Sequence, residues 1–380
     1  MFALALSGAA AAATTGKKGL NGGGVGRRFS FLPYGSSAPD DDGRPSLSCD
    51  GKVPGTTLDL THWTNNTTPD ALYADTSTEI ALNFARARLD DGEYREFDDA
   101  LVVNNHYDTD GVLSVFACLD PETALRHESL LIRGAESGDF GEWSSDEGVK
   151  LDLAVSAMLF AEDDDDSNGD EVEEEEEEEA AAYERALRTL PALLEDLEKT
   201  GGSRHEHLWR DGFEAAQAAW KGIAHAGIIP GTSLFLVETA PGMDRIPAYA
   251  VHRALRRAEA DGLSHAPANR ILHAVPSITA GVGGQQKLRY RYVYEKPGHG
   301  WVKRLRDRSA VPDADGEALA AAMSVGEWVG GGDGGLVAIC QSTGYVSGGG
   351  GGAESSASLS SHANVVDAIL DVDKGAAAIT

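Results

Sequence analysis

One histidine and two aspartates alternate in a short polar segment of this 380-residue chain, Asn-His-Tyr-Asp-Thr-Asp-Gly at residues 105–111. The segment follows an apolar stretch typical of a strand and precedes one typical of a helix. Because alternate residues at a strand end point to one side, His106, Asp108 and Asp110 can converge. An imidazole with two carboxylates suits a divalent ion such as Mn²⁺, Mg²⁺ or Zn²⁺.

The turn that ends this segment also has a purely structural interpretation. We expect Gly111 to take the positive φ that a tight turn between a strand and a helix often needs. Asp108 and Asp110 can cap the following helix without any metal. Capping does not require His106, so the histidine favours the metal-binding interpretation.

Two further sets of residues could complete a site around this segment. His62 follows a strand signal at residues 58–60 and lies in a polar turn, where it could act as a ligand or a general acid. Asp75 precedes a helix start and can serve as its N-cap or take a functional role beside His62. Asp139, in the sequence Gly-Asp-Phe-Gly at 138–141, could reach the two aspartates from a second strand or loop, or could belong to an ordinary turn.

Residues 101–116, in which a strand runs into Asp-Thr-Asp-Gly, resemble the first motif of the DHH phosphoesterases. That superfamily includes single-strand exonucleases, oligonucleotide and cyclic-dinucleotide phosphodiesterases and family II inorganic pyrophosphatases. The resemblance implies that Asp108 and Asp110 hold catalytic metal, and that Asp139 stands where those enzymes place another metal-binding aspartate. The chain departs from them because no Asp-His-His triplet occurs in it.

A broader resemblance, to an uncharacterised domain family of unknown function, extends over residues 55–305. It rests on Leu-Asp-Leu-Thr-His-Trp at 58–63 with Asn66, Thr68 and Pro69, on residues 74–80, on His106 to Gly111, on residues 138–140 and on Arg-Tyr-Arg-Tyr at 289–292. This resemblance supplies a grouping and no activity.

Arg289 and Arg291 are the candidate anion-binding residues. With Lys287 they alternate with apolar and aromatic residues, so a strand would place the basic groups on one face. Arginine pairs well with phosphate oxygens. The alternative is that these side chains only neutralise some of the chain's many acids.

The formal net charge of −29 at pH 7 is concentrated in one run, because residues 162–179 contain fourteen acidic residues. We interpret this run as a solvated, disordered insertion, since a block of like charge repels itself. A role in calcium buffering or in binding a basic partner is the alternative. The remainder is still acidic, which argues against a general nucleic-acid surface.

The ends of the chain are low in complexity. Residues 1–39 contain no Asp or Glu and begin with an Ala-rich stretch, which fits an organelle transit peptide or a disordered extension. Three widely spaced cysteines favour a reducing, intracellular compartment, either the cytoplasm or an organelle. No apolar run reaches the ~20 residues that span a bilayer. We therefore expect an extension at 1–50, an α/β domain at 51–345 interrupted by 162–179, and a Gly/Ser-rich linker with a terminal segment at 346–380.

Helical and strand patterns alternate between these pieces, which predicts an α/β fold with a mostly parallel sheet and flanking helices. The expected helices are at 76–89, 111–119, 180–199, 204–226, 247–260 and 315–323. The expected strands are at 101–104, 233–237, 270–274, 288–294 and 336–340.

Two functions are consistent with these residues. The first is a metal-dependent hydrolase of a phosphoester or phosphoanhydride, in which His106, Asp108 and Asp110 hold Mn²⁺ or Mg²⁺ and Asp139 or His62 completes the shell. Arg289 and Arg291 would neutralise a small phosphorylated substrate. The second is a catalytically silent α/β module that binds a small anionic ligand or a protein partner, which the missing triplet favours.

Overall fold

The computed structural model describes residues 28–63, 66–160, 171–230, 232, 234–240, 248–260, 268, 270–280, 286–295, 336–345, 366 and 370. Three predictions lie wholly or largely outside these residues, namely residues 1–27 of the expected transit peptide, the helix at 315–323 and most of the terminal segment at 346–380. Side chains of the last two strands are also outside the described part.

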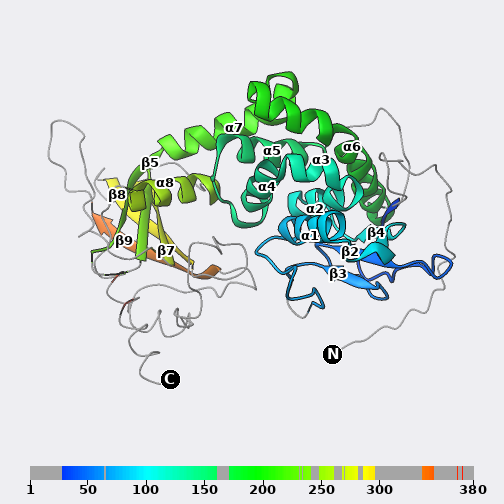
Figure 1. Ribbon diagram of the computed structural model, residues 1–380. Coiled ribbons are helices and arrows are strands. Elements are labelled where there is room, and N and C mark those ends of the chain that lie inside the picture. Colours follow the sequence, from blue (N-terminus) through cyan, green and yellow to red (C-terminus); the bar gives the residue numbers. More distant parts are fainter. Residues whose placement is uncertain are drawn as a thin grey trace, which may run out of the picture.

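Helices and strands alternate along the chain (Figure 1). The helices are α1 (Ser77–Arg86), α2 (Thr109–Leu119), α3 (Pro121–Arg126), α4 (Glu128–Phe140), α5 (Asp146–Ala157), α6 (Glu171–Thr200), α7 (Glu206–Lys221) and α8 (Ala248–Ala260). Shorter turns are a π-helical turn (Ala87–Asp91) and two 3-10 turns (Arg95–Phe97 and Ser203–His205). The strands are β1 (Arg28–Phe31), β2 (Ser46–Cys49), β3 (Leu58–Leu60), β4 (Leu101–Asn104), β5 (Ile223–Ile228), β6 (Leu234–Thr239), β7 (Arg270–Ala280), β8 (Gln286–Glu295) and β9 (Leu336–Tyr345).

Sheet A contains four parallel strands in the order β1-β4-β2-β3. Parallel neighbours need crossover connections, and α1 lies in the connection from β3 to β4. In Figure 1 the helices α1 and α2 lie directly on this sheet, with α3, α4 and α5 beyond them. The predicted α/β class, with a parallel sheet flanked by helices, is confirmed.

Sheet A is covered on both faces. Val102 of β4 packs into the main core with Leu47 and Leu60, whereas its neighbours Leu101 and Val103 pack into a second cluster. Successive strand residues point to opposite faces of a sheet. Because both faces are covered here, β4 consists of a continuous apolar run. Polar side chains that could form a site therefore lie at the carboxyl ends of the parallel strands.

Sheet B is a separate, mostly antiparallel sheet in the order β5-β6-β7-β8-β9, in which β6 and β7 pair in parallel. The apolar face of α8 covers it, and Ala254 and Leu255 pack with Phe235 and Val237. Figure 1 shows the two sheets at opposite ends of the molecule, with α7 reaching from one part to the other. The described residues therefore form two sheets, and the parallel prediction applies to sheet A.

The expected extension at 1–50 is wrong for its second half. Residues 28–50 contain β1 and β2, which are strands of sheet A, and β2 lies between β3 and β4. Each strand is four residues long and lacks a long apolar run, so hydrophobic periodicity does not reveal it. β2 is instead stabilised by burial between β3 and β4, and β1 is a half-buried edge strand that pairs with β4.

The expected disordered insertion at 162–179 is also wrong for its second half. Residues from Glu171 onward form the first turns of α6. Further along this helix, Ala182, Tyr183 and Leu190 are fully buried, so packing of the later turns supports the acidic ones. The start of a helix is also the end that favours negative charge. Residues 161–170 lie outside the described part.

The expected helix at 204–226 ends earlier than its apolar pattern indicates. Helix α7 stops at Lys221, and residues from Ile223 pair with β6 as the edge strand β5. Gly222 closes the helix, and sheet pairing overrides the remaining helical pattern. In the part of the chain that the structure describes, no helix has both the length and the apolar character needed to cross a bilayer.

Candidate metal centre

Three neighbouring strands of sheet A end in groups that could ligate a metal. Asp50 directly follows β2. His62 and His106 each lie two residues beyond the end of their strands, β3 and β4. These strands lie side by side and run parallel, so their carboxyl ends meet at one edge of the sheet. In open α/β sheets this edge is where ligands bind.

Asp50 lies at the middle of this edge. Its side chain is buried, with a relative exposure of 1%. Its Oδ2 lies 3.1 Å from His106 Nε2, its Oδ1 lies 3.6 Å from His62 Nε2, and Ser77 Oγ donates to Oδ1 at 2.7 Å. The backbone of Asp50 has φ of +50°, a left-handed conformation that costs a non-glycine residue roughly 1–2 kcal/mol. Local strain is thus maintained at the residue that both histidines face.

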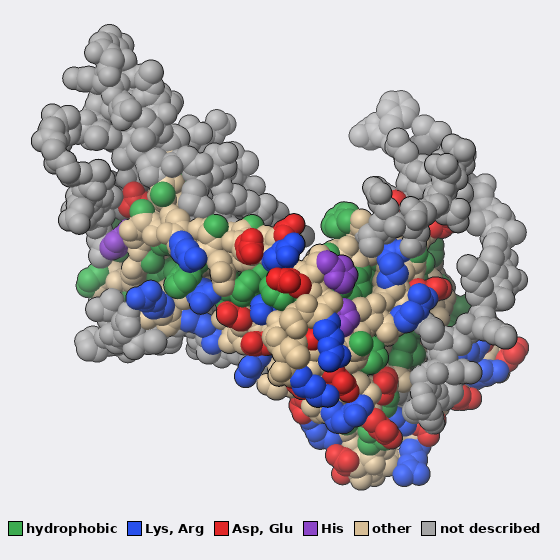
Figure 2. Space-filling view, turned by 90° about the horizontal axis from the view of Figure 1, so that it is seen from above, with side chains coloured by type: hydrophobic (Ala, Val, Ile, Leu, Met, Phe, Trp, Pro, Cys, Tyr) green, Lys and Arg blue, Asp and Glu red, His purple; other side chains and the backbone are tan. Residues whose placement is uncertain are grey.

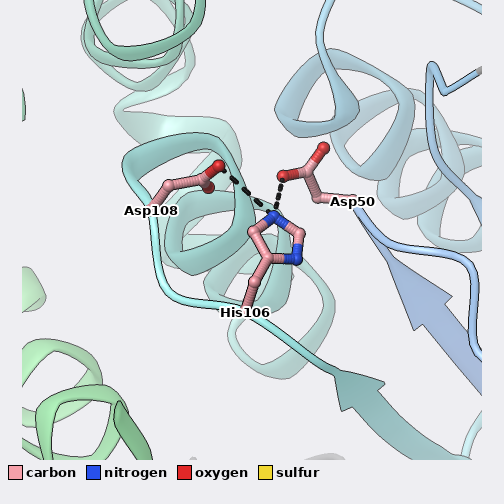
Figure 3. Close-up of side chains that lie close together, drawn as sticks. All are labelled: Asp50, His106 and Asp108. Carbon is pink, nitrogen blue, oxygen red and sulfur yellow. Dashed lines mark hydrogen bonds and ion pairs between the residues drawn. The ribbon is translucent and has the colours of Figure 1, made fainter. Parts of the chain in front are cut away.

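His106 faces two carboxylates with the same nitrogen (Figure 3). Its Nε2 lies 3.1 Å from Asp50 Oδ2 and 3.3 Å from Asp108 Oδ2. Its Nδ1 lies 3.2 Å from Asn105 Oδ1, an oxygen that can accept from a ring N–H. The ring of Trp63 lies beside the imidazole, with a centroid separation of 5.2 Å.

His62 resembles His106 in that one ring nitrogen contacts a fixed oxygen and the other faces two carboxylates. Its Nδ1 lies 2.7 Å from the carbonyl oxygen of Asp75. A carbonyl only accepts, so Nδ1 carries the donated proton and Nε2 is left to face the carboxylates of Asp139, at 3.2 Å, and Asp50. Asp139 comes from the last turn of α4 rather than from the predicted strand, loop or turn, and the helix ends at Gly141 with φ of +62°.

Asp110 has a structural task in addition to any role as a ligand. It is fully buried in the first turn of α2, and its carboxylate accepts from Ser77 N at 2.7 Å and Thr78 N at 2.8 Å. These N–H groups begin α1, where a carboxylate is favoured. The N-cap of α1 is Thr76, which forms a capping box with Glu79, so the prediction of Asp75 as the cap is wrong.

Gly111 is required for close packing and not for a positive φ. It lies inside α2 and is absent from the positive-φ glycines of the described residues, which contradicts the prediction. A Cβ at this position would lie 2.6 Å from Asn104 Nδ2 and 2.9 Å from Tyr183 Oη. Asp108 precedes it as the N-cap of α2, and its Oδ1 accepts from Gly111 N at 2.7 Å. The capping interpretation of Asp108 is therefore confirmed, while its Oδ2 faces His106.

The crowded charges shift the protonation of these groups. Burial, followed by the negative charges of Asp108 and Asp110, raises the pKa of Asp50 well above its usual value. Burial lowers the pKa of His106, but hydrogen bonds and charges from Asp108 and Asp50 outweigh it and raise that pKa to about 11. Desolvation opposes ionisation of Asp108, yet hydrogen bonds from His106 and Gly111 N hold its pKa below the usual range. Without a cation, the cluster retains protons that compensate for its negative charge.

These residues form two groups that could each hold a cation. The first is Asp50 with His106 and Asp108, and the second is Asp50 with His62 and Asp110; within each group the ligand atoms lie within 4.8 Å of one another. Asp50 belongs to both. Carboxylate oxygens with one imidazole nitrogen suit Mn²⁺, Zn²⁺ or Mg²⁺. The side chain of Asp108 is 45% exposed and that of His106 is 23% exposed, so the first group is open to a small molecule.

A family model provides the comparison with known proteins. The model of a family of unknown function (DUF6687) matches residues 27–342. The chain belongs to this family. The resemblance to an uncharacterised domain family is thereby confirmed, and the matched DUF6687 region contains every residue of the two groups. No curated protein and no solved structure matches the chain.

The structure brings together most of the residues that the sequence singled out. His106, Asp108, Asp110, His62 and Asp139 surround one sheet edge. Asp50 was missed, although an Asp-Gly pair directly follows its strand, because the sequence Ser-Leu-Ser-Cys of β2 has no strong strand signal. Arg289 and Arg291 lie in β8 as expected, opposite Ser277 and Val275 of β7, and their side chains lie outside the described part.

Proposed function

We propose that this protein is a hydrolase of phosphoesters or phosphoanhydrides that depends on Mn²⁺ or Mg²⁺. The observation that carries the proposal is the pair of imidazole Nε2 atoms, each directed at two carboxylates and both sharing Asp50. The resemblance of the Asp-Thr-Asp-Gly segment to the DHH phosphoesterases supports the choice of substrate class.

A cation explains this geometry better than packing does. The Nδ1 atom of His62 donates to a backbone carbonyl, an outer contact that metal-binding histidines typically make. With that proton fixed, a bare Nε2 lone pair facing carboxylate oxygens is repelled by them. A proton or a divalent cation between these atoms removes the repulsion.

The types of donor favour a hard or borderline ion. Both groups offer carboxylate oxygens and one imidazole, and neither includes a thiolate. Cys49, next to Asp50, is buried in the core with its Sγ 3.5 Å from Cys118 Sγ. Manganese and magnesium prefer such oxygen-rich sites, whereas soft ions select sulfur.

A divalent cation at this edge would supply Lewis acidity toward a phosphoryl oxygen and a water of lowered pKa. The protein's own residues would position the reaction. Asp50 would serve both groups, Asp108 would face the incoming phosphoryl group because it is the most exposed ligand, and Trp63 would flank it. His62 would act as a ligand or general acid, and Arg289 and Arg291 stay candidates for neutralising the substrate.

The missing Asp-His-His triplet is offset by residues from other elements. In the DHH phosphoesterases that triplet contributes to the metal pair, and here His62 and His106 come from the ends of two different strands. Asp139 adds a carboxylate from α4, 3.2 Å from His62. The proposed site would therefore be assembled from β2, β3, β4, α2 and α4.

The test combines metal binding with turnover. We expect the purified protein to bind Mn²⁺ stoichiometrically by calorimetry and to hydrolyse bis-p-nitrophenyl phosphate, p-nitrophenyl phosphate or pyrophosphate only when Mn²⁺ or Mg²⁺ is present. Asp50→Asn keeps a residue that tolerates positive φ and should weaken Mn²⁺ binding at least about 100-fold. Asp108→Asn should abolish turnover.

Asp211→Asn is the matched control, because Asp211 is 95% exposed on α7 and makes only a surface ion pair with Arg210 among the described residues. It should leave both metal binding and turnover unchanged. Failure of the wild type to bind Mn²⁺ or Mg²⁺ would overturn the proposal. Tight metal binding without hydrolysis of any of the three substrates would instead support the silent ligand-binding module.

A further inference from the structure

A pocket of about 420 Å³ lies between the end of α7, the edge strand β5 and α8. This volume is in the range of small-molecule sites. Its lining residues are Trp220, Lys221, Ile223, Ala224, His225, Ala226, Ala254, Arg257 and Ala258. None of them belongs to the candidate metal centre, which lies at the edge of the other sheet.

The lining has a charge opposite to that of the chain. Among the described residues it contains Lys221 and Arg257 and no acidic residue, in a protein whose net charge is −29. Within the part of the chain that the structure describes, neither basic side chain forms an ion pair, whereas neighbouring Arg256 pairs with Glu142 at 2.9 Å. Figure 2, a view from above, shows basic and apolar side chains next to each other over the lobe that carries sheet B. Two unpaired cations beside a pocket are a site for an anion.

His225 is a half-buried residue of the lining. Its Nε2 is buried and has no hydrogen-bond partner among the described residues. The strand register shifts between Ile223 and His225, so the pairing of β5 with β6 is irregular beside this residue. A buried ring nitrogen without a partner is destabilising, but solvent does not reach this atom, so we do not count it among the ligand contacts of the pocket.

Trp220 gives the pocket a rigid apolar wall. The guanidinium of Arg253 lies 4.1 Å from the centroid of the Trp220 ring and 4.2 Å from that of Trp143. This stacking between two rings fixes the position of Trp220. Ile223 and four alanines complete an apolar lining against which a flat ring can pack.

We propose that this pocket binds a small aromatic molecule that carries a phosphate, of the size of a nucleoside monophosphate. The phosphate pairs with Lys221 and Arg257, and the ring packs against Trp220 and the alanines. The site is independent of the proposed hydrolase activity, since it shares no residue with the metal groups.

The experiment is calorimetry on the full chain in EDTA, so that no metal recruits phosphate elsewhere. The probes are adenosine monophosphate, adenosine and inorganic phosphate. We expect the monophosphate to bind at least about tenfold more tightly than either fragment, because it alone engages both the basic residues and the apolar wall. Lys221→Gln and Arg257→Gln should each weaken binding about tenfold. Ala224→Trp, at an exposed lining position, should block it.

Two controls separate this pocket from other sites. Arg210→Gln removes an exposed charge of α7 that does not line the pocket, and it should leave the affinity unchanged. Asp50→Asn should also leave it unchanged. No binding of the monophosphate at 10 mM, on the order of the weakest useful affinity, would overturn the proposal. Equal binding by Lys221→Gln, Arg257→Gln and the wild type, or loss of binding in Asp50→Asn, would do the same.

Discussion

Asp50 combines three features that rarely occur in one residue. It is buried, its backbone is left-handed, and its carboxylate is shared by His62, His106 and Ser77. Aspartate tolerates positive φ better than most residues, but glycine would occupy this position without strain. The strain is therefore a reason to assign the carboxylate a functional task.

Asp152 gives a prediction about pH at the scale of one residue. Burial, aided by the charge of Asp108 and opposed by a hydrogen bond from Thr109, raises the pKa of Asp152 from 3.8 to about 7. Between these two values the folded protein keeps a proton that the unfolded chain loses. The free energy of unfolding therefore falls as pH rises through this window, by up to roughly 4 kcal/mol for this carboxyl.

Asp152→Asn should remove that decline, because asparagine does not ionise. Its amide oxygen can still accept from Thr109 Oγ1, which lies 2.6 Å from Asp152 Oδ1. Urea unfolding in EDTA at pH 4.5 and pH 8 measures the effect. We expect the free energy of unfolding of the variant, compared with that of the wild type, to be higher at pH 8 than at pH 4.5. A variant that follows the wild type at both pH values would show that Asp152 is ionised in the folded protein.

At the scale of elements, Asp110 and Asp108 differ in what they stabilise. Asp110→Ala leaves the first N–H groups of α1, Ser77 N and Thr78 N, without their buried acceptor. We expect a loss of about 3 kcal/mol in the free energy of unfolding. Asp108→Ala removes one cap of α2 at a half-exposed position and should cost about 1 kcal/mol.

Chemical denaturation of both variants in EDTA tests this difference without any contribution from metal. Equal losses of unfolding free energy in the two variants would mean that the Asp110 carboxylate does not stabilise the start of α1. The distinction matters for any study of the site, because inactivity of an Asp110 variant could follow from unfolding alone. Asp108 and Asp50 are the better positions for testing metal binding.

The sequence predicts those elements whose own residues carry the signal. Strand β4 has three consecutive apolar residues before Asn104, and α8 has a clear apolar face, so both were placed correctly. Helix α4 was missed because Gly134, Ser137 and Gly138 weaken its propensity, and Leu151 and Thr109 lie where glycine side chains would be. Tertiary packing, which a single sequence does not show, specifies that helix.

The same limit applies to the candidate site. His106, Asp108 and Asp110 were found because they adjoin one strong strand signal. Asp50 was missed because β2 is specified by its two neighbours and not by its own residues. The approach of Asp139 to His62 depends on α4, so no spacing in the sequence indicates it.

At the scale of the molecule, the two sheets have separate cores. The main core joins sheet A to α1, α2, α4, α5 and α6, whereas α8 and sheet B form another cluster. A smaller cluster of Trp143, Val149, Phe213 and Ala216 lies between them. Ligands of the two proposed sites should therefore stabilise different parts of the chain.

Hydrogen exchange can test that division. With Mn²⁺ bound, we expect slower amide exchange in α1, β4 and the first turn of α2, because the cation would fix the groups that these elements present. Exchange in β6 and α8 should be unchanged. Protection confined to sheet B, or protection of equal size in every element, would contradict the separation of the two parts.

The strand order of sheet A has a consequence for how the protein is made. β4 lies between β1 and β2 in the sheet, yet it is the last of the four strands in the chain. As the ribosome synthesises the chain from its N-terminus, β1 has no partner in the sheet until residue 104 has emerged. The segment that completes the sheet continues directly into His106, Asp108 and Asp110. Asp50 and His62 emerge earlier with β2 and β3, but neither group of ligands is complete until this segment has been made, so the finished sheet and the complete candidate site arise together.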